Sequence, residues 1–179
     1  MGHSQAEKAQ SRERILRKAA DAVRDTGLDS VSVGKLMRSV DLTHGGFYNH
    51  FESRSDLLAQ ALERALVEGG RTAAASTRSA DAPRSYETRV KSYVSRAHRD
   101  ARTDGCAIAA LASDVARADA ASRAVMSAHI DGFIGQLAQS LHSQDEGDAM
   151  LAVSAMVGAV LLARVQTDPK KSDMLLKSV

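Results

Sequence analysis

Proline occurs only twice in this chain of 179 residues, at Pro83 and Pro169, so long stretches contain no residue that breaks a helix. Aromatic residues make up 3% of the chain, tryptophan is absent and alanine is abundant, which leaves few residues that favour strands. The single cysteine excludes an intramolecular disulfide and a zinc site built from several thiolates. These features together predict an all-α protein.

The first part of the chain contains four predicted helices separated by short connections. Between Ser11 and Thr26 the apolar residues share one helical face, and Gly27 supplies a left-handed stop. Ser32 is predicted to cap a second, short helix. Thr43 is predicted to cap a third helix that runs to Asn49, and Ser53 a fourth that runs to about residue 70.

The rest of the chain is predicted to form a helical bundle. Its apolar residues recur at helical spacing, and glycine or acidic residues interrupt the pattern. We therefore expect two domains, a three-helix head in residues 1–52 and a helical body in residues 53–179. The helices expected in the body are Tyr86–Arg102, Cys106–Ala116, Ala120–His142, Asp148–Val165 and a last short helix that starts at Asp168-Pro169.

The longest uncharged run extends from Ala149 to Ala163 and is shorter than the ~18–20 residues that cross a bilayer. It is interpreted as a buried helix, with no membrane partner. The N-terminus is polar and charged, unlike a secretory signal. Together with the single cysteine, this predicts a cytoplasmic protein.

No pattern in the chain predicts catalysis. The HExxH and GxSxG motifs are absent, and so is a glycine-rich phosphate loop followed by Lys-Ser/Thr. His44 and His50 are six residues apart and fall on different faces of a helix, and the spacing of Cys106, His98 and His129 does not require them to converge. We expect no catalytic residues, no metal site and no cofactor.

Residues 33–58 have the spacing of a helix-turn-helix, whose second helix enters the major groove of DNA. An apolar inner side is supplied by residues such as Leu36, Phe47 and Phe51, which we assign to the core. Two adjacent glycines, Gly45 and Gly46, cost the helix roughly 1 kcal/mol each, as expected where the backbone must approach a bulky partner. A tight helical hairpin that serves only stability is the alternative interpretation.

The sequence Leu42-Thr43-His44-Gly45-Gly46-Phe47-Tyr48-Asn49-His50-Phe51, followed by Arg54-Ser55-Asp56-Leu57-Leu58, resembles the DNA-binding segment of TetR-type bacterial transcriptional regulators. The resemblance covers about residues 10–66. A weaker likeness at residues 104–112 is similar to the LmrA/YxaF-like branch of the family. One departure is Val40-Asp41, where the family commonly has Ala-Gly; Asp tolerates a left-handed backbone, so we expect the turn to persist.

The resemblance implies a homodimer that binds double-stranded operator DNA of pseudo-palindromic sequence, with its two recognition helices in successive major grooves. It places Thr43, His44 and Gly45 near bases or adjacent phosphates, and Tyr48, His50 and Arg54 on backbone phosphates. Asn49 lies on the same outward side of the segment, and Ser32 and Lys35 are further phosphate candidates.

The resemblance also implies that the last long helices pair two subunits and that the body binds a small-molecule effector. The helix at 148–165 is apolar over much of its circumference, which fits pairing or a central core helix within one subunit. The residues expected at the dimer interface are Met150, Val153, Met156, Val157, Val160 and Leu161. The residues expected to line an effector cavity, or else to form plain core, are Tyr93, Ala97, Leu111, Met126, Ile130, Phe133 and Leu137.

Cys106 has two interpretations. At a helix N-terminus the partial positive charge favours a thiolate that senses electrophiles or oxidants; otherwise Cys106 is a small buried apolar residue. We therefore expect a TetR-type repressor that an apolar organic effector releases from its operator. The alternative is a helical sensor or carrier, for a small molecule or an electrophile, with a degenerate DNA head.

Overall fold

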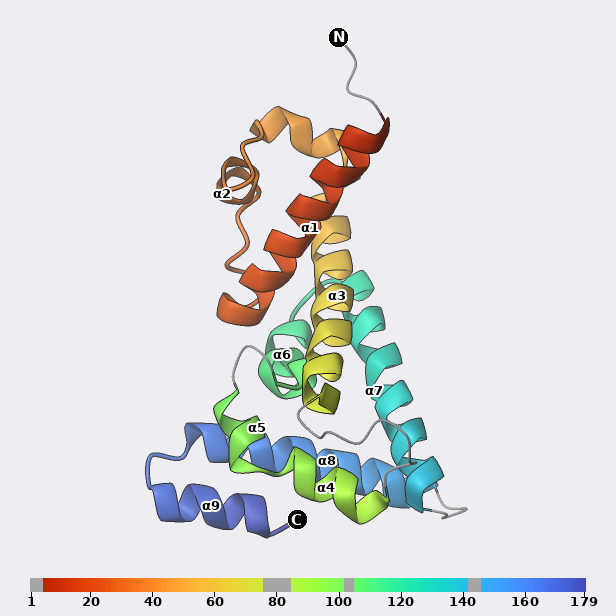
Figure 1. The fold of residues 1–179 in the computed structure, drawn as a ribbon, viewed down its shortest axis with the longest axis vertical. Helices are drawn as coiled ribbons and strands as arrows, with labels where there is room; N and C mark the ends of the chain where they lie inside the picture. Colours follow the sequence, from red (N-terminus) through yellow and green to blue (C-terminus); the bar gives the residue numbers. More distant parts are fainter. Residues whose placement is uncertain (1–4, 76–84, 102–104, 142–145) are drawn as a thin grey trace. The chain divides into compact units, whose positions relative to one another are not determined.

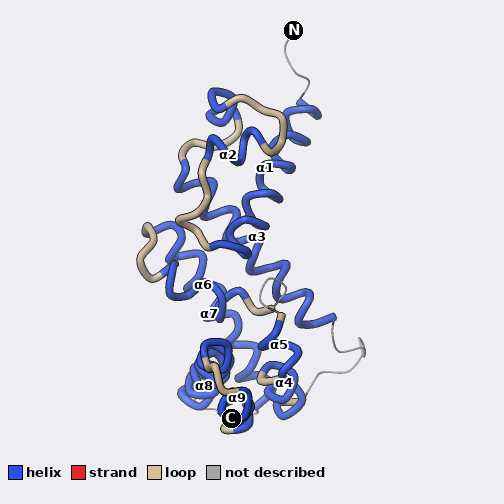
Figure 2. The backbone as a smooth tube through the Cα atoms, turned by 90° about the vertical axis from the view of Figure 1, so that its left-hand side faces the viewer, coloured by secondary structure: helices blue, strands red, loops and turns tan. Residues whose placement is uncertain are grey.

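The computed structural model describes residues 5–75, 85–101, 105–141 and 146–179. Within these ranges every regular element is a helix (Figures 1 and 2), and the all-α prediction is confirmed. The chain divides into two compact units, Met1–Val67 with Leu111–Met126 and Glu68–Ala110 with Ser127–Val179. The expected domain boundary after residue 52 falls inside the first unit.

The first unit is built around a helix-turn-helix. Helix α1 (Gln5–Thr26) is followed by α2 (Val33–Arg38), by the 3₁₀ helix η1 (His44–Asn49) and by α3 (Arg54–Ala75), whose residues up to Val67 belong here. The end of α6 (Ala107–Val115) and the beginning of α7 (Ala120–Leu141) complete the unit.

The core of the first unit comes from the apolar faces that the sequence indicated. Ile15, Ala19 and Val23 of α1 are fully buried, as are Leu57 and Leu62 of α3. Gly27 ends α1 with a φ of +85°, and its amide donates to Val23 O at 3.0 Å, so the predicted left-handed stop is confirmed. The predicted cap of α3 is also present, because the Asp56 amide donates to Ser53 Oγ at 3.0 Å.

The second unit contains α4 (Tyr86–Tyr93), α5 (Arg96–Asp100), α8 (Glu146–Val165) and α9 (Pro169–Lys177), together with the remaining residues of α3, α6 and α7. Helix α8 packs against both α5 and α9 (Figure 1). The last helix starts at Asp168-Pro169 as expected, with Pro169 in its first turn. Asp168 caps it by accepting from the amides of Lys170 and Lys171.

The single helix expected from Tyr86 to Arg102 is wrong, and Arg102 itself lies outside the described residues. α4 ends at Tyr93 and α5 begins at Arg96, because Val94 leaves the helical conformation with a ψ of 38°. Ser95 then caps α5, accepting from the His98 amide at 3.2 Å. The apolar spacing continues across Ser95, so the sequence pattern could not show that one helix ends and another begins there.

Candidate nucleic-acid interface

The turn between α2 and η1 depends on one residue with a left-handed backbone. Asp41 has a φ of 60°, and the next amide, that of Leu42, donates back to Met37 O at 2.9 Å. Asp adopts this conformation more readily than most residues. The turn therefore forms without the glycine that the resembling family has nearby, as expected.

The segment expected to be a recognition α-helix is a 3₁₀ helix in this structure. The Gly46 amide donates to Thr43 O and the His50 amide to Phe47 O, both three residues back. Thr43 occupies the N-cap position, but its side chain makes no capping hydrogen bond. Two glycines in six residues weaken an α-helical ladder, and short runs of this kind tighten to 3₁₀ geometry.

Phe47 and Phe51 anchor η1 in the core of the first unit. They are 1% and 2% exposed, and their rings stack with centroids 5.6 Å apart. Both side chains therefore face inward, as predicted. Because Phe47 points into the core, His44, Gly45 and Tyr48 on other sides of η1 face solvent.

The outward side of η1 carries most of the side chains expected at DNA. Thr43, His44, Gly45 and Asn49 are exposed, and Tyr48 is 68% exposed. A Cβ added at Gly45 would meet nothing within 4 Å, which leaves the backbone open to close approach.

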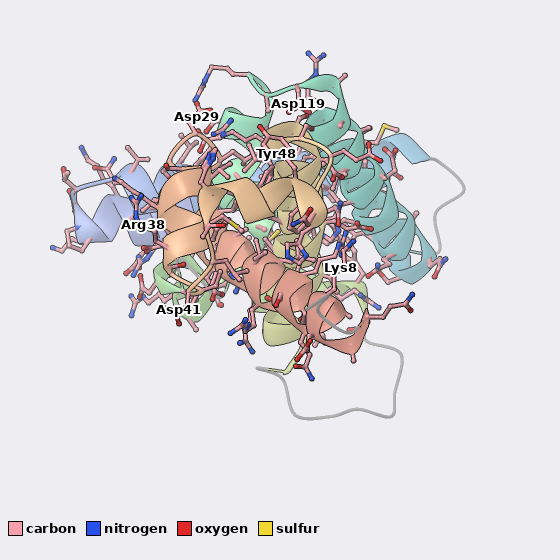
Figure 3. The ribbon with its side chains drawn as sticks, turned by 90° about the horizontal axis from the view of Figure 1, so that it is seen from above. Lys8, Asp29, Arg38, Asp41, Tyr48 and Asp119 are labelled. Carbon is pink, nitrogen blue, oxygen red and sulfur yellow. The ribbon has the colours of Figure 1, made fainter. Side chains whose placement is uncertain are left out.

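Exposed residues of the neighbouring helices surround this segment. Ser32 and Lys35 are exposed at α2, although Ser32 makes no side-chain capping bond. Figure 3 shows Tyr48 on the face of the first unit, with Arg38 and Lys8 on different sides of it. Neither Arg38 nor Lys8 was among the expected contacts; both are exposed cations. Five of the residues from Lys8 to Lys18 are lysine or arginine and one is glutamate, and this local positive excess could have identified Lys8.

His50 differs from the other expected phosphate contacts because its ring is partly buried. Its Nδ1 is buried and has no hydrogen-bond partner within the described part of the chain. Burial lowers the pKa of His50, and the nearby charges of Lys8 and Arg12 lower it further. The imidazole is therefore held in its neutral form more strongly than an exposed histidine.

Arg54, expected on phosphate, has a guanidinium that is engaged within the protein. Its Nε donates to Val31 O at 3.2 Å, and one Nη donates to Leu28 O at 3.3 Å and to Asp29 O at 3.4 Å. All three acceptors lie in the connection between α1 and α2. Sequence position alone gave no sign of these contacts.

The residues expected to line an effector cavity are divided between the two units. Tyr93, Phe133 and Leu137 share one apolar cluster of the second unit, where the rings of Tyr93 and Phe133 stack with centroids 5.4 Å apart. In the same unit Ile130 is half-buried and Ala97 is exposed. Leu111 and Met126 are buried and belong to the first unit.

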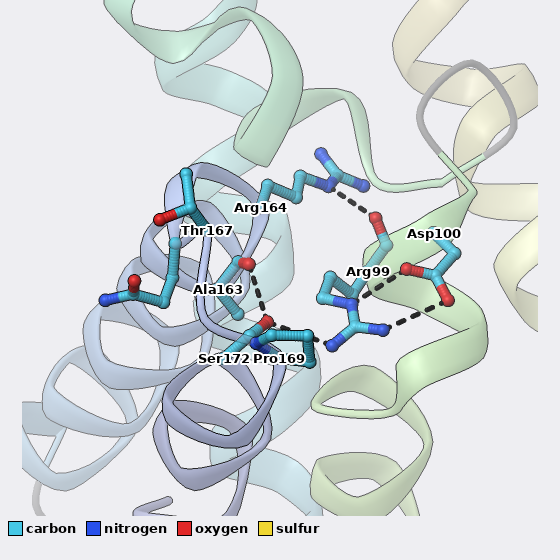
Figure 4. A pocket seen from close by; sticks show the side chains of 8 residues that line it. Arg99, Asp100, Ala163, Arg164, Thr167, Pro169 and Ser172 are labelled. Carbon is cyan, nitrogen blue, oxygen red and sulfur yellow. Dashed lines mark hydrogen bonds and ion pairs between the residues drawn. The ribbon is translucent and has the colours of Figure 1, made fainter.

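A separate pocket of about 300 Å³ lies beside α5, α8 and α9 in the second unit (Figure 4). Arg99 faces it with a guanidinium that contacts Asp100, Asp173 and Ser172. Arg164 donates to the carbonyl oxygens of His98, Arg99 and Ala101. Arg164 of α8 therefore binds the end of α5, and Arg99 joins α5 to α9.

Helix α8 presents two apolar faces. Val153, Met156 and Val160 are buried in the core of the second unit and Val157 is half-buried, whereas Met150 and Leu161 are exposed. Three further large residues, which were not among those expected at the dimer interface, are exposed on α8: Leu151 at 71%, Leu162 at 56% and Val165 at 73%. By length and composition the stretch Gly147–Val165 also qualifies as a candidate membrane span, a third of it buried.

Cys106 lies just before α6 and is half-buried. Its amide donates to His98 Nε2 at 2.8 Å, while His98 Nδ1 lies 2.6 Å from Tyr93 O. A backbone amide can donate only to an unprotonated nitrogen, so His98 is neutral and carries its proton on Nδ1. Reactivity of the Cys106 thiol stays a prediction.

Comparison with known proteins agrees with this geometry. Residues 15–61 match the family of bacterial regulatory proteins named tetR. A comparison with curated proteins finds no match.

Similar solved structures extend over nearly the whole chain. The reduced form of NemR from E. coli has 20% identity and a TM-score of 0.73, over 94% of this chain and 92% of that one. A TetR-family regulator from Cytophaga hutchinsonii has 17% identity and a TM-score of 0.76, over 98% and 94%. One from Chloroflexus aurantiacus has 22% identity and a TM-score of 0.74, over 97% and 94%. The chain therefore carries the N-terminal domain of the tetR family, with its DNA-binding helix-turn-helix, on the fold of TetR-family transcriptional regulators.

Proposed function

We propose that this chain is a cytoplasmic, non-enzymatic repressor that binds a pseudo-palindromic operator as a homodimer and leaves it when a small apolar organic molecule binds. The observation that carries the proposal is the division of η1 into two sides. Phe47 is buried, while the polar residues and the open backbone at Gly45 face solvent. Such a segment has the requirements of an element that reads a DNA groove.

The DNA contacts that we propose fall into two classes. Thr43, His44 and Gly45 at the start of η1 approach base edges, with Asn49 at its end. Tyr48, His50, Ser32 and Lys35 contact phosphates, which fix the orientation of the segment without reading sequence. Lys8 and Arg38 extend the phosphate contacts on either side, because both are exposed cations on this face.

The homodimer that we propose uses the outer face of α8. Met150, Leu151, Leu161, Leu162 and Val165 recur at helical spacing, and a Cβ added at Gly158 of the same helix would meet nothing within 4 Å. An exposed apolar row of this length is rare on a monomer and typical of an interface. Burial of this face between two copies also explains why α8 is apolar enough to resemble a membrane span. Val153, Met156 and Val160 then serve the core of each subunit.

The effector site that we propose lies at the cluster of Tyr93, Phe133 and Leu137, which combines stacked rings with few charges. An apolar molecule that prefers a conformation unsuited to DNA would release the operator. The likeness of residues 105–112 to the LmrA/YxaF-like branch supports placing the body of this chain in that branch; Asp104 of the same pattern lies outside the described residues.

A gel shift with fragments of the gene's own upstream region tests the proposal. We expect retarded migration of one fragment at nanomolar protein and a steep loss of binding as salt rises. A protein that retards no fragment even in dilute buffer would not be a repressor of its own promoter region. Size-exclusion chromatography with light scattering tests the dimer separately, and a monomer at micromolar concentration would contradict it.

A further inference from the structure

The reading segment η1 has little stability of its own. It has six residues, two of them glycine, and its N-cap side chain makes no capping bond. Helices this short do not persist without tertiary support. The orientation of Thr43, His44 and Tyr48 therefore depends on the groups that hold the two ends of the α2–η1 pair, residues 33–49.

One group holds the end of η1. Arg12, on α1, donates from Nε to His50 O at 3.3 Å, one residue after η1 ends. Its Nη2 donates to Gln60 Oε1 on α3, and Gln60 in turn donates to Asp56 at 2.6 Å. The guanidinium carbon also lies 5.0 Å from the centre of the Phe51 ring. One side chain thus joins α1, α3 and the end of the reading segment.

A second group holds the approach to α2. Arg54 is the first residue of α3, where the helix dipole disfavours a positive charge. The carbonyl oxygens of Leu28, Asp29 and Val31 surround its guanidinium and offset that cost. Val31 lies two residues before α2 begins, so Arg54 fixes the start of the α2–η1 pair relative to α3.

We propose that Arg12 and Arg54 are positioning residues that bracket the helix-turn-helix, and that neither contacts phosphate. The inference rests on the proposed function for its DNA readout. Each guanidinium donates hydrogen bonds to two or three oxygens of the protein itself: Arg12 to a backbone and a side-chain amide oxygen, and Arg54 to three backbone carbonyl oxygens. Arg54, which sequence position had placed on phosphate, therefore acts through the shape of the head.

The chemistry of arginine and lysine separates positioning from phosphate contact. Lysine carries the same charge and binds phosphate well as a point charge. It cannot reproduce the fixed fork of the guanidinium, which reaches several carbonyl oxygens at once. A residue that contacts phosphate should therefore tolerate Arg→Lys, whereas a positioning residue that donates several guanidinium hydrogen bonds at once should not.

The test compares Arg12→Lys, Arg54→Lys and the two alanine variants on the upstream fragment that the wild-type protein retards. We expect each lysine variant to bind about tenfold more weakly, nearly as weakly as the alanine variant. The slope of log affinity against log salt should stay at the wild-type value in all four. Lys35→Ala is the matched control, and its slope should fall by about one ion.

A loss of specificity distinguishes positioning from general destabilisation. The ratio of affinity for the retarded fragment to affinity for an unrelated duplex should fall in Arg12→Lys and Arg54→Lys, whereas a partly unfolded protein loses both equally. If Arg12→Lys does not fold, Arg12→Gln retains donors toward His50 O and takes its place. Wild-type affinity in the lysine variants, or a slope lowered by about one in the alanine variants, would overturn the proposal.

Amide hydrogen exchange tests the bracket without DNA. We expect residues 44–51 to exchange at least severalfold faster in Arg12→Lys than in the wild-type protein, with α3 unchanged. Unchanged exchange in this segment would contradict the bracket whatever the DNA result. If the wild-type protein retards no fragment, the proposed function fails, and the exchange experiment still decides this inference.

Discussion

The two compact units differ in where they leave large apolar side chains exposed. Among the described residues of the first unit only Tyr48 and Val67 are exposed at this size. The second unit exposes a longer set: Met150, Leu151, Leu161, Leu162, Val165, Met174 and Val179. The first unit therefore closes its own core and turns a polar face to solvent, as a DNA-binding head requires.

The second unit uses one helix for two purposes. On α8, Val153, Met156 and Val160 are buried, while Leu151 and Leu162 remain open. A helix that is apolar all around must bury its second face against something. Apolar character in the first unit therefore marks the core, whereas in the second unit it marks both the core and the proposed partner surface.

The largest expected effect tests this difference directly. Placing carboxylates at Leu151 and Leu162 of α8 should convert the dimer to a monomer at micromolar concentration, because an unpaired charge is costly to bury. Operator affinity should fall at least a hundredfold, since each half-site would be bound by a separate head. Light scattering and gel shift measure the two outcomes.

Val67→Asp is the matched control, because Val67 is the exposed aliphatic residue of the first unit, 47% exposed. It should leave the mass of the particle unchanged. A double α8 variant that still runs as a dimer would place the interface elsewhere.

The next largest effect concerns the stability of the first unit. Gly27→Ala would place a Cβ 2.4 Å from Asp114 Oδ2 at a backbone with a φ of +85°. We expect a loss of about 2–3 kcal/mol in the free energy of unfolding, from backbone strain and from the displaced carboxylate. Urea unfolding followed by circular dichroism measures it.

Gly45→Ala provides the contrast, because nothing lies within 4 Å of the added methyl group. It should change the free energy of unfolding by no more than ~1 kcal/mol. Adding Asp114→Ala to Gly27→Ala should recover part of the loss. Equal costs at the two glycines would mean that the backbone at Gly27 is not strained.

The elements of the first unit were predictable because their signals are local. Gly27, Asp41 and the Ser53–Asp56 cap each act within a few residues, and the spacing of Phe47 and Phe51 already assigned them to the core. The helix type of η1 was not predictable, since the choice between 3₁₀ and α geometry depends on which neighbours hold a glycine-rich segment. The engagement of Arg54 with residues 28–31 is a tertiary contact that no spacing encodes.

In the second unit the sequence predicted where most helices lie, but it did not predict which side of each helix is buried. Val153 and Leu151 of α8 are equally apolar, so periodicity could not tell which one packs inside the subunit. The break at Val94-Ser95 was missed because apolar spacing continues across it. Two hydrogen bonds hold this break in place, one from the His98 amide to Ser95 Oγ and one between His98 Nδ1 and Tyr93 O. Both form only after the chain has turned, so apolar spacing does not reveal them.

A smaller effect compares two tyrosine hydroxyls, one in each unit. Tyr48→Phe removes an exposed hydroxyl from η1 and should weaken binding to all DNA sequences about equally, by roughly threefold to tenfold, with stability unchanged. Tyr93→Phe removes a buried hydroxyl that lies beside the Cys106 thiol, which is only a weak hydrogen-bonding group, and that makes no stronger hydrogen bond within the described residues. Loss of that group should leave DNA binding unaltered and stability equal or higher. A sequence-selective loss in Tyr48→Phe would indicate base contact.

The smallest effect concerns the dependence of stability on pH. Burial lowers the pKa of His98 below its ordinary value of 6.5; the bond to Tyr93 O opposes this shift, and Arg164 adds to it. Because the unfolded chain then binds the proton more readily than the folded one, stability contributed by His98 is complete above pH 6.5 and is lost as the pH falls below it. Unfolding measured between pH 7.5 and 5.5 should show this decline.

His98→Gln should make that decline shallower, because its amide can serve both Tyr93 O and the Cys106 amide without binding a proton. Some decline should remain, since burial also lowers the pKa of His129 in the same unit and of His50 in the first. His50→Gln is therefore the paired variant, and its effect should be smaller because the His50 ring is the less buried of the two. If His98→Gln kept the full wild-type dependence, the acid sensitivity would belong to His129 or His50 instead. The neutral state of His98 would then result from the packing of α5 and would make no measurable contribution to the pH dependence of the free energy of unfolding.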